Sequence, residues 1–269
     1  MTASRLLVVK LGGGEGLDLA AACDDLSRIA GRRALAVVHG VSAIMNQLCL
    51  ESGVEVQSLQ SPSGHSSRYT PPAVRDIYVR AAEAANDLLV SALRERGLSA
   101  VGFVGDNLAL KGRRKTAIRA VVNGRVRVIR DDHSGSIVGV DSAKILQSLD
   151  RAKTPVLPPM AISGDGPLNV DGDRAAAAVA GALDAETLVI LSNVAGLYRR
   201  FPDETSIVDQ VTLAQIDEAL DWAQGRMKRK TLAAREALSQ GVERVIIADG
   251  RVSNPVSRAL DGAGTRFSR

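Results

Sequence analysis

Short runs of purely apolar residues recur along the chain, and each is followed by glycines or small polar residues and then by a stretch with helical spacing. Runs without alternation are typical of strands buried on both faces of a parallel sheet. The sequence predicts such strands at residues 6–9, 34–39, 100–105, 154–158, 187–191 and 245–248, and takes the last of these as the final strand.

Helical patterns alternate with these strands over the whole length. We expect helices at residues 18–29, 43–52, 73–96, 141–150, 174–183 and 225–241, with a mixture of loop and helix at 204–223. This alternation predicts an α/β protein, a three-layer αβα sandwich around a central, mainly parallel sheet. A change of character near residue 160 predicts a single domain, 1–269, with two lobes, 1–160 and 161–269, on one continuous sheet.

The segment between the third strand and the second lobe is rich in basic residues. Two runs, 117–122 and 125–130, are joined by Asn123-Gly124, a strong signal for a hairpin. Alternate side chains of a strand share a face, so several of its arginines can lie on one surface. A further basic run precedes the hairpin and contains Lys111, Arg113, Arg114 and Lys115. Two interpretations stay open: a solvated edge that resists aggregation, or a dock for an acidic partner.

Composition limits the remaining possibilities. The chain has 269 residues, 45% of them apolar and 24% charged, as in an ordinary soluble globular protein. No apolar run approaches a membrane span and no leader pattern is present, so we expect a cytoplasmic protein without a membrane partner. The net charge of +4 is too mild to indicate nucleic acid. Cys23 and Cys49 lie in helical patterns, which favours buried free thiols over a disulfide or a metal site.

Two strand ends carry turns of small residues. The first strand runs into Lys10 and then Gly12-Gly13-Gly14, and the second ends in His39-Gly40-Val41-Ser42. A strand, a glycine turn and a helix N-terminus together offer free amides to phosphate. The P-loop and the dinucleotide fingerprint are both excluded, because their required residues are absent. We interpret His39 as a hydrogen-bonding residue at the end of its strand.

Six stretches in order resemble the amino-acid kinase family, which includes acetylglutamate, glutamate 5-, carbamate and uridylate kinases. They are Val9–Gly13, Val38–Gly40, Ser67–Thr70, Asn169–Asp173, Leu191–Gly196 and Gly225–Lys230. The resemblance implies a carbamate kinase-like fold. Within the family, Gly112–Ala117, Ala223–Lys230, Ala248–Val252 and Asn254-Pro255 resemble the kinases that phosphorylate α-aminoadipate attached to the acidic amino-group carrier protein LysW in lysine biosynthesis.

The resemblance implies a reaction in which a carboxylate attacks the γ-phosphoryl group of ATP and forms an acyl phosphate. It implies that Lys10 and Lys230 supply positive charge, that Asp173 holds both lysines, and that phosphate is bound by the backbone amides of Gly12, Gly13 and Gly40. Substrate would be bound by Arg68, Asn169, Val41 and Ser42, and the nucleotide near Ser192, Asn193, Gly196 and Tyr198. Magnesium would be held mainly by the phosphates of ATP, so no metal site on the protein is expected. The carrier would dock at Lys111, Arg113, Arg114 and Lys115, and a homodimer is the default assembly.

Alternatives remain at this point. They are acetylglutamate kinase of arginine biosynthesis, a kinase of LysW-linked glutamate, and a non-catalytic nucleotide-binding or storage protein on the same fold. One residue departs from the resembled pattern, because Val41 stands where those kinases carry glycine. A β-branched residue avoids positive φ, so either its amide works at ordinary φ or the loop sits differently.

Overall fold

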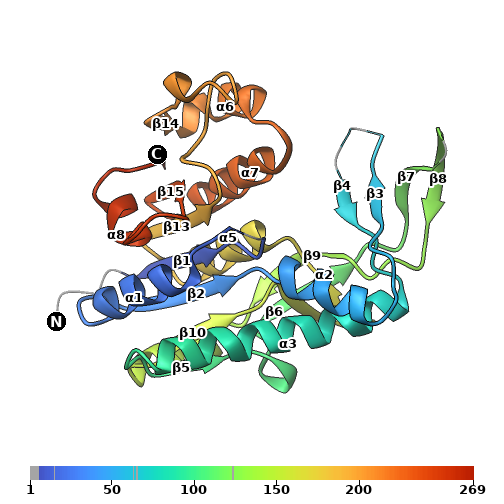
Figure 1. Cartoon of the computed structure of the whole chain (residues 1–269), viewed down its shortest axis with the longest axis horizontal. Helices are drawn as coiled ribbons and strands as arrows, with labels where there is room; N and C mark the ends of the chain where they lie inside the picture. The colour runs from blue at the N-terminus through green and yellow to red at the C-terminus, as the bar shows by residue number, and fades with distance from the viewer. Residues whose placement is uncertain (1–5, 15, 63, 65, 123) are drawn as a thin grey trace.

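The structure, a computed structural model, describes residues 6–14, 16–62, 64, 66–122 and 124–269 (Figure 1). Its central sheet has eight strands, β1 (Leu7–Leu11), β2 (Leu35–His39), β5 (Ala100–Gly102), β10 (Thr154–Leu157), β13 (Thr187–Ser192), β14 (Gln210–Thr212), β15 (Arg244–Asp249) and β16 (Thr265–Ser268). Their order is β14-β16-β15-β13-β1-β2-β10-β5, and every neighbouring pair is parallel except β15–β16. The predicted α/β class with a mainly parallel sheet is confirmed.

Helices cover both faces of this sheet. They are α1 (Leu19–Ala30), α2 (Ser42–Glu51), α3 (Pro72–Arg94), α4 (Ser142–Asp150), α5 (Gly172–Ala182), α6 (Ile216–Trp222), α7 (Gly225–Ser239) and α8 (Pro255–Leu260). Short 3-10 turns lie at Gly105–Asn107, Glu204–Ser206 and Leu213–Gln215. Carboxylates cap several N-termini; Asp18, for example, accepts from the amide of Ala21. Among the described residues no helix combines the length and apolar character needed to cross a membrane.

Alternate side chains of β1 point to opposite faces of the central sheet, and each face is covered by its own layer of helices. Leu7, Val9 and Leu11 pack in one core with α1, α3 and α8. Val8 points to the opposite face and packs in the core formed with α5 and α7. Lys10 shares the face of Val8, because residues two apart in a strand point the same way. Lys10, the one charged residue of this otherwise apolar strand, is therefore directed toward α5 and α7.

A second sheet, of four strands, was not predicted. It is ordered β12 (Gly166–Asn169), β11 (Met160–Ser163), β6 (Leu110–Arg114) and β9 (Gly135–Val140). The basic run that precedes the hairpin lies in this sheet: Lys111 to Arg114 belong to β6, between β11 and β9.

Two hairpins stand side by side at the edge of the molecule (Figure 1). One pairs β3 (Ser58–Gln60) with β4 (Ser66–Arg68). The other pairs β7 (Ile118–Val122) with β8 (Arg125–Ile129), which confirms the predicted hairpin; Asn123 of its turn lies outside the described residues. Opposed residues share a face, so Arg125 and Arg127 lie on one side of this hairpin and Arg119 on the other.

The C-terminal strand also differs from expectation. The run at 245–248 was taken as the last strand, but β16 follows it and pairs antiparallel with β15. Thr265 and Phe267 of β16 are fully buried. Both predicted free thiols, Cys23 and Cys49, are confirmed as buried.

Candidate functional site

A buried cluster of charge lies where β1, α5 and α7 meet. The ammonium of Lys10 is 2.9 Å from Oδ1 of Asp173, and that of Lys230 is 2.9 Å from Oδ2. The residues are 6%, 7% and 8% exposed in the order Lys10, Asp173, Lys230. One carboxylate therefore holds two lysines from different elements and leaves an excess of one positive charge at a nearly dry position.

The electrostatics of this cluster follow from burial and pairing. Burial alone would raise the pKa of Asp173, but the ammonium groups of Lys10 and Lys230 hold that pKa well below its ordinary value. Burial lowers the pKa of Lys230, and the charge of Asp173 opposes that change. A cation that is partly desolvated yet fixed in place is suited to bind a developing anion.

Two glycine turns lie against each other beside this cluster. A Cβ on Gly13 would stand 2.3 Å from the carbonyl carbon of Gly40, so the backbones touch there. The amide of Ala43, in the first turn of α2, donates to the carbonyl of Gly13 at 2.7 Å. The turns that follow the neighbouring strands β1 and β2 therefore lie side by side.

The amides of these turns are not equally free. Gly40 N–H donates to the carbonyl of Leu11 at 3.0 Å, so the expected donation from Gly40 to phosphate conflicts with this bond. Within the described chain, the amides of Gly12, Gly13 and Val41 donate to no other residue. Val41, which stands where the resembled kinases carry glycine, has φ −127° and ψ 0°. Its amide is therefore available at a φ that a β-branched residue adopts without strain.

His39 occupies the structural role expected of it. Its Nδ1 lies 3.1 Å from the carbonyl oxygen of Gly40, and its Nε2 lies 3.1 Å from Nδ2 of Asn86. Asn86 Nδ2 also donates to the carbonyl of Val156 at 2.9 Å. This pattern assigns the proton to Nδ1. Burial lowers the pKa of His39 to about 4, so the ring is neutral at pH 7.

Arg68 and Asn169 are connected through Thr70, a residue that sequence reasoning missed. Asn169 Nδ2 donates to Thr70 Oγ1 at 3.1 Å, and Thr70 Oγ1 donates to the carbonyl of Arg68 at 3.3 Å. Arg68 Nη2 donates to Oδ1 of Asn46 at 2.6 Å. Its Nη1 is buried and has no hydrogen-bond partner among the described residues. An unused guanidinium donor is what a substrate carboxylate requires.

The residues expected at the nucleotide lie at the end of β13 and in the segment that follows it. Ser192 and Tyr198 are buried, and Tyr198 packs edge to face on Phe201 with ring centroids 5.8 Å apart. A Cβ on Gly196 would stand 2.6 Å from Oγ1 of Thr265, so Gly196 allows close packing against β16. Asn193 is the exposed member of the expected set.

The basic start of α7 contributes two arginines that sequence reasoning did not assign. Arg226 Nη1 lies 3.7 Å from the place of a Cβ on Gly14, beside the first glycine turn. Arg229 Nη2 donates to the carbonyl of Ser66 in β4, and its Nη1 lies 3.6 Å from Oδ2 of Asp171. The signal available was the cluster of cations next to Lys230.

The residues expected to dock a carrier divide into two groups. Lys111, Arg113 and Lys115 are exposed. Arg114 points the other way, donating from Nε to the carbonyl of Asp132 at 2.8 Å and from Nη2 to that of Arg130 at 2.7 Å. Arg114 therefore holds the segment before β9 in place.

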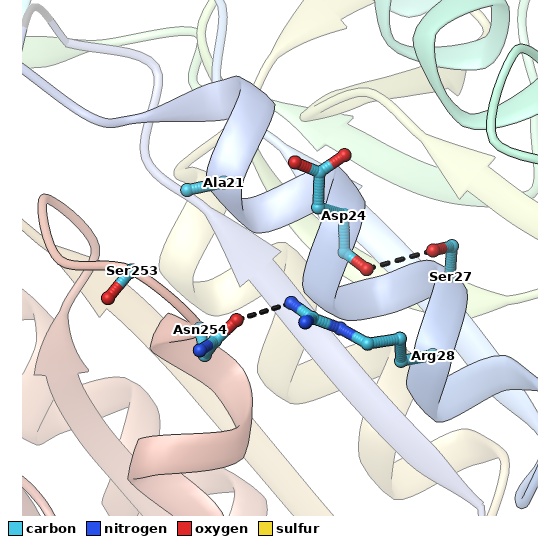
Figure 2. A pocket seen from close by; sticks show the side chains of 6 residues that line it. All are labelled: Ala21, Asp24, Ser27, Arg28, Ser253 and Asn254. Carbon is cyan, nitrogen blue, oxygen red and sulfur yellow. Dashed lines mark hydrogen bonds between the residues drawn. The ribbon is translucent and has the colours of Figure 1, made fainter.

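Two further features of the described residues are candidates for a site: a surface pocket and possible clusters of metal ligands. Figure 2 shows a surface pocket between α1 and the segment before α8, and it contains none of the expected site residues. Arg28 Nη2 donates there to Oδ1 of Asn254. Across the described residues, no group of three or more His, Cys, Asp or Glu side chains is placed to hold a metal ion.

Sequence comparison places this geometry in a family context. The model of the amino acid kinase family matches residues 5–249. The [LysW]-aminoadipate kinase of Deinococcus radiodurans is 41% identical over 268 residues, 98% of this chain and 92% of that protein. That of Thermus thermophilus is 41% identical over 97% of this chain and 99% of its own. A putative [LysW]-aminoadipate/[LysW]-glutamate kinase of Pyrobaculum calidifontis is 38% identical over 98% of this chain and 99% of its own.

Solved structures support the same fold at lower identity. N-acetylglutamate synthase from Neisseria gonorrhoeae, complexed with coenzyme A and N-acetyl-glutamate, superposes with a TM-score of 0.80 at 24% identity, over 98% of this chain and 59% of that one. Carbamate kinase from Giardia lamblia, bound to AMP-PNP, gives 0.68 at 17% identity over 100% of both chains. The family match over residues 5–249, together with relatives 41% identical over nearly the whole chain, establishes that the chain belongs to the amino acid kinase family.

Proposed function

We propose that this protein uses ATP to phosphorylate the side-chain carboxylate of α-aminoadipate attached to the carrier protein LysW. The observation that carries the proposal is the buried group of Lys10, Asp173 and Lys230 next to the free amides of Gly12 and Gly13. The relatives named [LysW]-aminoadipate kinase, 41% identical over nearly the whole chain, support this acceptor.

The chemistry requires no general base. A carboxylate is already ionised at neutral pH, so its oxygen attacks the γ-phosphorus directly while the bond to the β-phosphate oxygen breaks and ADP leaves. The main difficulty is repulsion between two anions. Lys10 and Lys230 supply positive charge to the transferring group, the amides of Gly12 and Gly13 donate to its oxygens, and Asp173 keeps both ammonium groups in place.

The acceptor side is formed by Arg68, Asn169 and the amides of Val41 and Ser42. The free Nη1 of Arg68 supports binding of a carboxylate, and the shared contact with Thr70 fixes Arg68 relative to Asn169. ATP enters as its magnesium complex, a substrate whose metal is carried by the phosphates. Adenine is proposed to lie near Ser192, Asn193, Gly196 and Tyr198.

The carrier is proposed to dock on the exposed cations Lys111, Arg113 and Lys115. We propose that the protein acts in the cytoplasm. We also propose a homodimer, because closed two-fold dimers are the commonest assembly. LysW-linked glutamate is a second candidate acceptor, since relatives such as the Pyrobaculum protein carry both names.

The decisive experiment measures ADP release by the purified chain with carrier-linked aminoadipate, carrier-linked glutamate and acetylglutamate in parallel. We expect turnover with carrier-linked aminoadipate and kcat/KM at least about a hundredfold lower for free acetylglutamate, because the carrier supplies extra binding energy. The Lys10→Ala variant is the control for contaminating kinases. A clear preference for acetylglutamate would reject the proposed acceptor and favour a role in arginine biosynthesis.

A further inference from the structure

Arg229 joins three elements that surround the reacting groups. It lies on α7 directly before Lys230. Its Nη2 donates to the main-chain carbonyl of Ser66 on β4, and its Nη1 lies 3.6 Å from Oδ2 of Asp171. One guanidinium thus connects α7 to a hairpin and to the N-terminus of α5, both distant in sequence.

Each of these contacts is next to a residue of the proposed site. Ser66 precedes Arg68 by two residues on β4. Asp171 lies between Asn169 and Asp173, and its Oδ1 accepts from the amides of Asp173 and Arg174 at 3.0 Å each. The contacts of Arg229 therefore bear on Arg68, Asp173 and Lys230 together.

The chemistry of arginine suits this bridge. Among the described residues β4 pairs with β3 alone, so its other edge presents main-chain groups that can accept a further hydrogen bond. A planar guanidinium with several fixed donors can reach two acceptors at once, whereas the ammonium of lysine acts as a point charge. The Arg229 side chain is 37% exposed, so the contact adds little to stability, and its consequence is geometric.

We propose that Arg229 is a positioning residue that holds the hairpin β3–β4 against α5 and α7, and so couples binding of the acceptor to binding of the nucleotide. The inference rests on the proposed function, since it needs an acceptor at Arg68 and a phosphoryl donor at Lys230. When Arg68 engages the acceptor, the hairpin is fixed, and Arg229 transmits that order to the helix that carries Lys230.

The test uses Arg229→Gln and Arg229→Lys in the full chain. For each protein, titration calorimetry gives the Kd of a non-hydrolysable ATP analogue with and without the acceptor that the parent phosphorylates. We expect the parent to show coupling of about fivefold or more. Both variants should show a coupling factor near one, and their nucleotide Kd without acceptor should stay within about twofold of the parent. Their kcat should be at least about tenfold lower, because a small misplacement of the reacting groups slows the chemical step.

Lys228→Gln is the matched control, because Lys228 is an exposed neighbour on the same helix whose side chain makes no hydrogen bond or ion pair within the described chain. It should behave as the parent. Parental kcat and coupling in Arg229→Gln would overturn the inference, as would an uncoupled parent. Full recovery in Arg229→Lys would show that charge alone matters and would also overturn it.

A lower unfolding temperature with equal weakening of both ligands would indicate a merely structural role for Arg229 and would count against the inference as well. Failure of the proposed function gives a different result. If the parent prefers acetylglutamate, the acceptor assignment is wrong, while the coupling measurement proceeds on acetylglutamate and still decides the role of Arg229.

Discussion

Gly13 and Gly40 touch backbone to backbone, and this contact places the two anion-binding turns side by side. A Cβ on Gly13 would meet the carbonyl carbon of Gly40 at 2.3 Å, and a Cβ on Gly40 would meet the amide nitrogen of Gly13 at 2.3 Å. The obstacle in both directions is main chain, which cannot rotate away as a side chain can. Glycine is required at both positions because of this close approach.

Gly13→Ala should therefore separate the two turns. We expect kcat to fall by at least about a hundredfold, because the free amides lose their alignment, and the free energy of unfolding to fall by about 1–3 kcal/mol, as in overpacked cores. Gly31→Ala is the control: Gly31 has φ −68°, and the nearest atom to an added Cβ is 3.9 Å away. Equal effects of the two substitutions in steady-state kinetics and urea unfolding would contradict this account.

The two lysines on Asp173 should act on the transition state. Lys10→Ala and Lys230→Ala should each lower kcat by roughly a hundredfold to a thousandfold, the range found when one charge-stabilising donor is removed. KM for ATP should change only modestly, because the lost interaction belongs mainly to the transition state. Lys228→Ala, an exposed lysine on the same helix, should leave both constants unchanged. A near-parental kcat in either variant would remove that lysine from the mechanism.

Stability should depend on pH through His39. Its pKa is about 4 in the folded protein against an ordinary value of 6.5, so the unfolded chain takes up the proton first as pH falls. Stability is therefore full above the unfolded value and declines below it, by up to about 1.4 kcal/mol per pH unit.

The His39→Asn variant keeps a donor where Nδ1 stands but does not titrate. Urea unfolding at several pH values between 7 and 5 should show a steeper loss of stability in the parent than in this variant. Asp173 has a depressed pKa, so it stabilises the fold at every pH above the ordinary pKa of its carboxyl group. That contribution is lost only at lower pH, and it is the same in the parent and in the variant. Parallel slopes would mean that His39 is not buried neutral.

The core of the fold was predictable because its signals are local. Leu7, Val8 and Val9 form an unbroken apolar run, and such runs occur where both faces of a strand are covered. The four-stranded sheet carried no such signal. Gly112 and Gly135 lie in this sheet, where a Cβ on Gly112 would stand 3.1 Å and one on Gly135 2.7 Å from Leu168 Cδ1. Close packing therefore requires glycine at these positions, and the strands lack the continuous apolar run that identifies a buried strand.

The sequence predicted which residues form the site better than it predicted what each residue does there. Lys10, Asp173 and Lys230 come together as the family resemblance implied. Whether a particular amide is free depends on the neighbouring strand, however, and Gly40 uses its amide on Leu11. Arg114 shows the same limit, since only the structure reveals that it donates to main-chain carbonyls while Arg113 next to it is exposed.

The remaining prediction concerns how the carrier reaches the site. Lys111, Arg113 and Lys115 are exposed on and just after β6, whereas Arg114 has structural partners and is left unchanged. Electrostatic docking raises the association rate and is screened by salt. KM for the carrier-linked substrate should therefore rise steeply with ionic strength, while KM for ATP changes much less.

Replacing Lys111, Arg113 and Lys115 together by glutamine should raise the carrier KM roughly tenfold at low salt and flatten its salt dependence, because steering by charge is lost. The matched control replaces Arg32, Arg151 and Lys153 by glutamine, which removes the same net charge from exposed positions just before β2 and β10, at the amino ends of these parallel strands and away from the glycine turns at the carboxyl ends of β1 and β2. If both triple variants change the carrier KM equally, only net charge matters. If the first triple variant keeps the parental KM and salt slope, these cations form a solvated edge, and acetylglutamate becomes the better acceptor.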